Sequence, residues 1–165
     1  MGISLAYVVK GEVRVGVVHA PFQGETFVAV RGGGAALNGR PLEARATVQL
    51  ADALISTGFP HDHADMKNIL ARLGCVIQAC RDLRRLASPA IDICWIAAGR
   101  LDAAYETLRP WDVAAARLVA REMGVQRDHY SPARAALPPE LRGDDVVFAR
   151  AGLIEQLLAV LRLKA

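Results

Sequence analysis

Two carboxylates, Glu106 and Asp112, lie close together in the sequence, at the predicted end of a strand and the predicted start of a helix. Residues 101–105 are apolar or small and lie between Gly99 and Pro110, which favours a short buried strand. Glu106 then ends this strand at an exposed tip. Asp112 follows at the start of the helix, and an aspartate there can hold a divalent cation, because hard cations prefer oxygen ligands.

The helix that positions Asp112 is predicted from an apolar face. Asp112 directly precedes the apolar run and is therefore placed at the helix N-cap. Aspartate is a favoured N-cap residue and capping alone contributes roughly 0.5–2 kcal/mol, so plain capping is the alternative interpretation of Asp112. The apolar face can be formed by Val113, Ala116, Leu118, Val119 and Met123.

The other elements divide into two groups. Short apolar or alternating runs at residues 3–9, 12–19 and 25–31 are separated by turn signals, which indicates an antiparallel meander. Gly32-Gly33-Gly34 lacks the context of a phosphate-binding loop and is interpreted as a hairpin turn, with Asn38-Gly39 as a second tight turn. From about residue 53 onward, strands and helices alternate, as in a layered α/β protein. Strands are predicted at residues 53–57, 83–86 and 145–149, and helices at residues 64–73, 89–98 and 151–161.

Several short motifs surround the two carboxylates. Tyr105-Glu106 is followed by Pro110-Trp111-Asp112-Val113-Ala114-Ala115 and then by Arg121-Glu122-Met123-Gly124. Upstream motifs lie at Gly16-Val17-Val18, Gly24-Glu25-Thr26-Phe27, Arg31-Gly32-Gly33-Gly34-Ala35, Leu37-Asn38-Gly39 and Ser56-Thr57-Gly58-Phe59-Pro60. Over about residues 3–125, this pattern resembles the inositol monophosphatase family.

The resemblance implies a layered α/β fold of the sugar-phosphatase type. It also implies Mg²⁺-dependent hydrolysis of a phosphomonoester, such as inositol monophosphate or another small polyol or sugar phosphate. Asp112 matches a metal ligand of the family, and Glu106 matches a glutamate that binds substrate hydroxyls, because a carboxylate can accept from two hydroxyl groups. Ser88, Pro89 and Ala90 match a substrate loop in which backbone groups at a helix start meet the sugar or its phosphate.

The family's main metal-binding motif, Asp-Pro-Ile/Leu-Asp-Gly-Thr, does not occur in the sequence. Residues 3–6 resemble the family's segment directly after that motif, so residues 1–165 are interpreted as a single domain that matches the C-terminal part of the fold and is incomplete at its N-terminus. No catalytic residue is assigned within it. Ala87 and Pro89 replace a Gly and an Ala of the family, which removes backbone freedom and one N–H donor from the substrate loop.

Three interpretations of the chain stay open. It is a phosphatase fragment that is inactive alone, a catalytically dead or split-enzyme subunit, or a truncated product whose uncovered sheet edge promotes aggregation. The expected partners are a small polyol or sugar phosphate and either a second copy of the chain or a complementing N-terminal half.

A second group of possible metal ligands is His61-Asp62-His63-Ala64-Asp65. These residues are consecutive in a predicted loop, whereas a zinc site needs three or four ligands fixed in geometry. An exposed loop, with Asp62 or His63 near the start of the next helix, is the preferred interpretation.

Composition narrows the class of protein. The 165 residues are 53% hydrophobic and 22% charged, which is typical of one globular unit with a core. The net charge of +3 comes from scattered arginines without interleaved aromatic residues, so nucleic-acid binding is not expected. No apolar run reaches the roughly 20 residues of a membrane span. Three cysteines outside any CxxC pattern suit a reducing compartment, and a cytoplasmic protein is expected.

Overall fold

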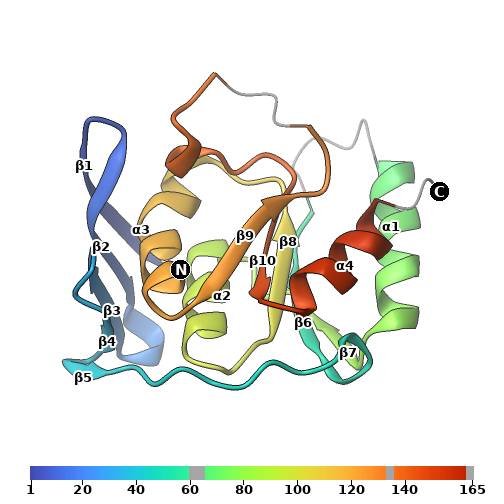
Figure 1. Cartoon of the computed structure of the whole chain (residues 1–165), viewed down its shortest axis with the longest axis horizontal. Helices are drawn as coiled ribbons and strands as arrows, with labels where there is room; N and C mark the ends of the chain where they lie inside the picture. Colours follow the sequence, from blue (N-terminus) through green and yellow to red (C-terminus); the bar gives the residue numbers. More distant parts are fainter. Residues whose placement is uncertain (60–65, 133–135, 163–165) are drawn as a thin grey trace.

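The structure, a computed structural model, describes residues 1–59, 66–132 and 136–162. In this part of the chain two five-stranded sheets are separated by a layer of helices, and further helices cover the far side of the second sheet (Figure 1). This arrangement confirms the predicted layered α/β fold with an antiparallel meander at its start.

The first sheet is formed by the N-terminal strands in sequence order. Every neighbouring pair is antiparallel, as predicted. Asn38 and Gly39 have positive φ angles of 49° and 77°, as the two-residue turn between the last two strands requires. The strands are β1 (Ile3–Val9), β2 (Glu12–Ala20), β3 (Glu25–Val30), β4 (Ala35–Leu37) and β5 (Arg40–Pro41).

The second sheet is mixed and has the order β7-β6-β8-β10-β9. Its strands are β6 (Leu54–Thr57), β7 (Asp82–Arg84), β8 (Ala103–Glu106), β9 (Val125–His129) and β10 (Val146–Arg150). β6 is parallel to both β7 and β8, whereas β10 is antiparallel to both β8 and β9. The helices are α1 (Met66–Ala79), α2 (Pro89–Ala97), α3 (Pro110–Glu122) and α4 (Leu153–Leu161).

Two hydrophobic clusters hold these layers together. In the larger one, α2 and α3 pack between the sheets, with Phe27 of β3, Ile96 of α2 and Phe148 of β10 almost fully buried. The second cluster joins the other face of the second sheet to α4, through residues such as Ile55 and Leu157. The second sheet therefore has helices on both faces (Figure 1).

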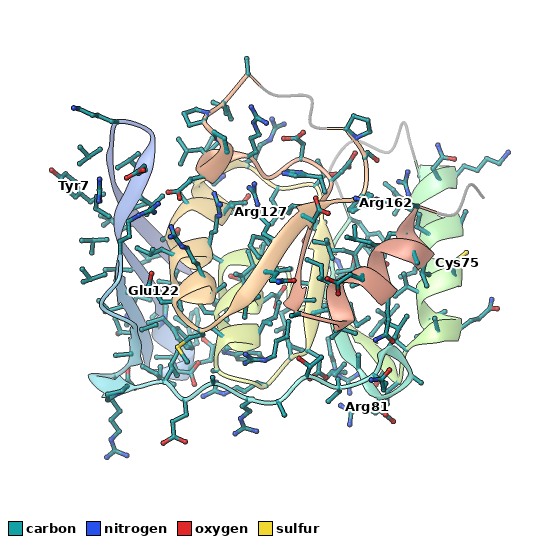
Figure 2. All side chains as sticks on the ribbon, in the orientation of Figure 1. Tyr7, Cys75, Arg81, Glu122, Arg127 and Arg162 are labelled. Atoms are coloured by element: carbon teal, nitrogen blue, oxygen red, sulfur yellow. The ribbon has the colours of Figure 1, made fainter. Side chains whose placement is uncertain are left out.

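The outer face of the first sheet has no such cover in the described part of the chain. Leu5 is 65% exposed and Tyr7 is 62% exposed, and Figure 2 shows Tyr7 pointing away from the helices. In the register of the sheet Leu5 pairs with Val17, which pairs with Val28, so apolar side chains from three strands share this face.

Several details differ from the sequence predictions, among them the short strands β4 and β5, which were not predicted. Helix α1 continues to Ala79 instead of ending at residue 73. Gly74 therefore lies inside the helix and does not end it. β9 was not predicted, and helix α3 begins at Pro110, so Asp112 lies in its first turn instead of at the N-cap. The histidine-containing segment 61–65 lies outside the described residues. Within the described ranges, no helix is long and apolar enough to cross a membrane.

Candidate active site

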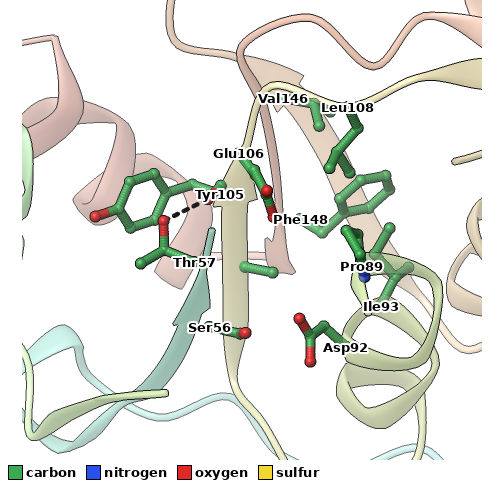
Figure 3. Close-up of a pocket in the computed structure, with 11 residues that line it drawn as sticks. Ser56, Thr57, Pro89, Asp92, Ile93, Tyr105, Glu106, Leu108, Val146 and Phe148 are labelled. Atoms are coloured by element: carbon green, nitrogen blue, oxygen red, sulfur yellow. Dashed lines mark hydrogen bonds between the residues drawn. The ribbon is translucent and has the colours of Figure 1, made fainter. Parts of the chain in front are cut away.

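A small cavity lies where β6, β8 and the start of α2 meet (Figure 3). β6 and β8 run parallel with Thr57 opposite Tyr105, so the carboxyl ends of both strands reach the same edge of the second sheet. Glu106 is the last residue of β8, and Pro89 and Asp92 line the cavity from the first turn of α2. Ligand sites of α/β proteins are common at such edges.

The cavity has room for a very small group. About 10 Å³ is open to the centre of a water-sized sphere, which is enough for about one water molecule or one hydroxyl group. Ile93 and Phe148 contribute apolar walls, while Ser56, Asp92 and Glu106 contribute polar side chains. The cavity therefore combines apolar walls with two carboxyl groups.

Glu106 is half-buried, and its surroundings favour the protonated form. Burial, followed by the negative charges of Asp92 and Asp112, raises the pKa of Glu106 from 4.5 to about 7, although Arg85 acts in the opposite direction. At neutral pH a carboxyl group with this pKa is partly protonated, so it can donate a hydrogen bond as well as accept one.

Asp92 is the more deeply buried of the two carboxyl groups, with 4% of its surface exposed. Burial raises the pKa of Asp92 from 3.8 to about 6, while a hydrogen bond from Ser56 acts against this shift. The Oδ1 atom of Asp92 is buried and has no hydrogen-bond partner among the described residues. A buried carboxylate with an unpaired oxygen is costly, so Asp92 lowers the stability of the fold wherever it is ionised.

Asp112 lies outside this cavity, in the first turn of α3. The N-cap of α3 is Arg109, Pro110 takes the first helical position, and the Asp112 Oδ2 atom accepts a hydrogen bond from the Arg109 amide N–H over 3.0 Å. The predicted N-cap position was therefore wrong, because proline is favoured at the first helical position and shifts the helix start. The interaction is the acidic half of a capping box.

The predicted substrate loop lies at the start of α2. Ser88 is the N-cap but makes no capping hydrogen bond with its side chain, and its carbonyl oxygen accepts from the amides of Ile91 and Asp92. Pro89 lines the cavity with Glu106, whereas Ser88 and Ala90 are not among its lining residues, and Ala90 is buried in the core. The structure thus brings Pro89 and Glu106 together and leaves Ser88, Ala90 and Asp112 outside the cavity.

Ala87, directly before this loop, has a φ angle of +56°. This left-handed conformation costs an L-residue with a Cβ roughly 1–2 kcal/mol and costs glycine almost nothing. The substitution of the family's Gly by Ala87 therefore strains the backbone beside the cavity.

The described residues do not form a metal site by themselves. No group of three or more His, Cys, Asp or Glu in the described ranges is arranged to hold a metal ion. Mg²⁺ requires near-octahedral coordination by oxygen atoms, and Asp112 offers one carboxylate whose Oδ2 is already bonded to a backbone amide. Further ligands are required before a magnesium ion fits here.

Sequence reasoning missed Asp92, Ser56 and Gly58 as parts of the site. Asp92 had a visible signal, because it is the only charged residue in an otherwise apolar helix, residues 89–97. Its position against Ser56 depends on how α2 packs on β6, which no local pattern reveals.

A mixed sheet between helices, with a carboxylate-lined cavity at its carboxyl edge, defines a layered α/β protein with an edge site. The sequence profile of the inositol monophosphatase family matches residues 1–159, and the chain belongs to this family. The recognition from sequence motifs is therefore confirmed. Members of the family are generally phosphatases that use divalent metal ions.

Individual relatives support the assignment and show a difference in length. The chain is 41% identical to a Nus factor SuhB of Pasteurella multocida over 124 residues, which are 74% of this chain and 46% of that relative. It is 38% identical to an inositol-1-monophosphatase of Mesorhizobium japonicum, again over 74% of this chain and 47% of that relative. The chain thus spans about half the length of these curated relatives.

Solved structures agree with the fold. The crystal structure of the extragenic suppressor protein SuhB from Bartonella henselae has a TM-score of 0.87 and 29% identity, covering 98% of this chain and 61% of that chain. An IMPase from Thermotoga maritima has a TM-score of 0.82, also with 29% identity, covering 97% of this chain and 60% of that chain.

Proposed function

We propose that the chain is part of a Mg²⁺-dependent phosphomonoesterase that hydrolyses inositol monophosphate or a related small polyol or sugar phosphate. The observation that carries this proposal is the position of Glu106, a half-buried carboxyl group beside a cavity that admits about one hydroxyl group. Family membership supports the phosphate-ester chemistry.

The proposed roles of the two carboxylates are different. Glu106 accepts hydrogen bonds from substrate hydroxyls and orients the polyol, and the apolar wall at Phe148 keeps bulk water away from that contact. Asp112 supplies one oxygen to a metal ion, which when bound would neutralise phosphate charge and favour departure of the alkoxide.

The start of α2 offers fewer donors to a phosphate than is usual for a helix. Pro89 has no amide N–H, and the amides of Ile91 and Asp92 donate to the Ser88 carbonyl. Weak anion binding is therefore proposed for Ser88, Pro89 and Ala90, with orientation by Glu106 as the main contribution of this chain.

A second candidate is a catalytically inactive subunit that acts through a partner. It is supported by the relatives named Nus factor SuhB, whose name does not describe a phosphatase, and by the small number of metal ligands among the described residues. The partner of either candidate is a second copy of the chain or a polypeptide that supplies the N-terminal half of the family fold.

The two candidates differ in a complementation assay with inositol 1-phosphate and Mg²⁺. The purified chain alone should release no phosphate above background, because one carboxylate competes poorly with water for Mg²⁺. Adding the N-terminal half of a family member that carries the Asp-Pro-x-Asp-Gly-Thr motif should produce activity that EDTA abolishes. The matched control is the same half with both motif aspartates changed to asparagine.

Each outcome selects one description of the chain. EDTA-sensitive turnover by the chain alone would contradict the proposed dependence on a second half. A mixture that forms a complex but stays inactive would favour the non-catalytic subunit.

A further inference from the structure

Gly58 follows β6 directly and lies beside Glu106 at the carboxyl edge of the second sheet. A Cβ atom at Gly58 would overlap the carboxyl carbon and both carboxyl oxygens of Glu106. The three nearest atoms to that position all belong to Glu106. The space that a side chain would occupy at residue 58 is therefore filled by the Glu106 carboxyl group.

Backbone conformation does not explain why glycine stands at this position. Gly58 is not among the glycines with a positive φ angle, so an L-residue could adopt its backbone conformation. Gly39 and Gly124 show the opposite situation, because their φ angles are +77° and +74° and a Cβ there would meet nothing within 4 Å. At Gly58 a side chain is excluded for lack of space, because the Glu106 carboxyl group occupies that space.

We propose that Gly58 is a positioning residue for Glu106, because the absence of a side chain lets the carboxyl group lie against the end of β6 beside the hydroxyl-sized cavity. Loss of this room would turn the carboxyl group away from the cavity. The consequence for substrate choice rests on the proposed function, whereas the geometric role of Gly58 does not.

The direction of the displacement is set by the groups that surround Glu106. Inward movement is blocked, because the cavity has room for about one water molecule and Asp92 lies on its far side. The charged groups that act on Glu106 are Asp92 on α2, Asp112 on α3 and Arg85 after β7. An added methyl group at residue 58 therefore pushes the carboxyl group outward, toward water.

The test is a carbon-13 NMR titration of the Glu106 carboxyl group in the full chain, with Gly58→Ala compared to the parent. An outward carboxyl group is better hydrated, so its midpoint should fall by about one pKa unit or more from the parent value. Gly74→Ala is the matched control, because a Cβ at Gly74 meets nothing within 4 Å. The control should leave the midpoint unchanged. An unchanged or raised midpoint in Gly58→Ala would overturn the proposal.

If Gly58→Ala does not fold, a double variant still tests the proposal. In the double variant Gly58→Ala with Glu106→Ala, the carboxyl group that causes the overlap is gone, so this protein should unfold at the same urea concentration as Glu106→Ala alone. A double variant that is clearly less stable than Glu106→Ala would show that Gly58 is needed by other parts of the fold, and the proposal would be wrong.

The consequence for substrates is measured in the complemented enzyme. Gly58→Ala should raise KM for inositol 1-phosphate about tenfold and leave KM for p-nitrophenyl phosphate, which has no polyol hydroxyls, nearly unchanged. An equal rise for both substrates would refute the role in substrate choice. If the complemented enzyme is inactive, the proposed function fails, while the titration still decides the positioning role.

Discussion

Glu106 and Asp112 lie at the two ends of one short loop, yet their surroundings are opposite. Glu106 is half-buried at the end of a strand, beside a cavity whose shape is set by Asp92, Phe148 and the start of α2. Asp112 lies in the first turn of a helix next to Trp111, which is 68% exposed, and its hydrogen bond is with the Arg109 amide. The proposed hydroxyl-binding side is thus packed within the chain, whereas the proposed metal-binding side has a single assigned carboxylate among the described residues.

The largest expected effect comes from Asp112. In the complemented enzyme, Asp112→Asn should lower kcat by about 10² or more and raise the Mg²⁺ concentration needed for activity, because it removes a charge from the metal site. Phosphate release at increasing Mg²⁺ measures both effects. Asp128→Asn is the control, because Asp128 is an exposed carboxylate on β9 that pairs with Arg162. If Asp112→Asn kept the wild-type rate at saturating Mg²⁺, Asp112 would have only a structural role in the first turn of α3.

Glu106→Gln should have a smaller and different effect. The amide keeps one acceptor oxygen but loses the charge, so KM for inositol 1-phosphate should rise by about tenfold with little change in the Mg²⁺ requirement. Titration against Mg²⁺ and against two polyol phosphates separates this pattern from that of Asp112→Asn. If Glu106→Gln alone changed the metal requirement, the two assigned roles would have to be exchanged.

The two carboxyl groups that line the cavity, Asp92 and Glu106, also determine how the stability of the fold should depend on pH. The pKa values of Asp92 and Glu106 are raised to about 6 and about 7, so the folded chain binds protons more tightly than the unfolded chain. The resulting stabilisation is complete below about pH 4 and is lost as the pH rises through 6 and 7. Asp92→Asn should therefore stabilise the chain at neutral pH, by an amount on the order of 1–3 kcal/mol, and should flatten the pH dependence.

Urea unfolding of the parent and of Asp92→Asn at acidic and neutral pH tests this expectation. Asp52→Asn is a suitable control, because Asp52 lies in a short 3-10 helix before β6 and is exposed. Equal stability of the parent and Asp92→Asn at neutral pH would show that the buried carboxylate is satisfied by a bound water or ligand.

The smallest effect concerns the strained residue beside the cavity. Ala87→Gly should be neutral or stabilise the chain by up to about 1 kcal/mol, because relief of the +56° φ angle is partly offset by the greater freedom of glycine in the unfolded state. Ala71→Gly within α1 should have the opposite sign and cost about 1 kcal/mol. Thermal unfolding of both variants measures the difference. A clear loss of stability in Ala87→Gly would show that the backbone at residue 87 is not strained.

Local signals in the sequence were enough for much of the fold. β1 was predicted with its observed limits, because its apolar run ends at the Lys10-Gly11 turn. β9 was missed because its sequence, Val-Gln-Arg-Asp-His, is polar and becomes a strand only by pairing with β10 at the edge of the sheet.

The site shows the same division between local and tertiary information. Glu106 was predicted at an exposed strand end, and the structure has it at the end of β8 but half-buried. The raised pKa of Asp92 and the room at Gly58 arise from contacts between α2, β6 and β8, which are distant in sequence. Such features become visible only when the packing of these elements is known.

Arg150 connects the two helices that carry the proposed site residues. Its buried guanidinium donates to the carbonyl oxygens of Ile96 and Met123, at the C-terminal ends of α2 and α3, while the opposite ends of both helices carry the proposed site residues. Arg150 therefore links the C-terminal ends of two helices that also pack against each other in the core. The 13 residues of α3 span about 20 Å, so a rotation of about 3° at Arg150 would move Asp112 by roughly 1 Å relative to Pro89. A change at the buried Arg150 would therefore alter the alignment of the proposed site residues at the opposite ends of the two helices.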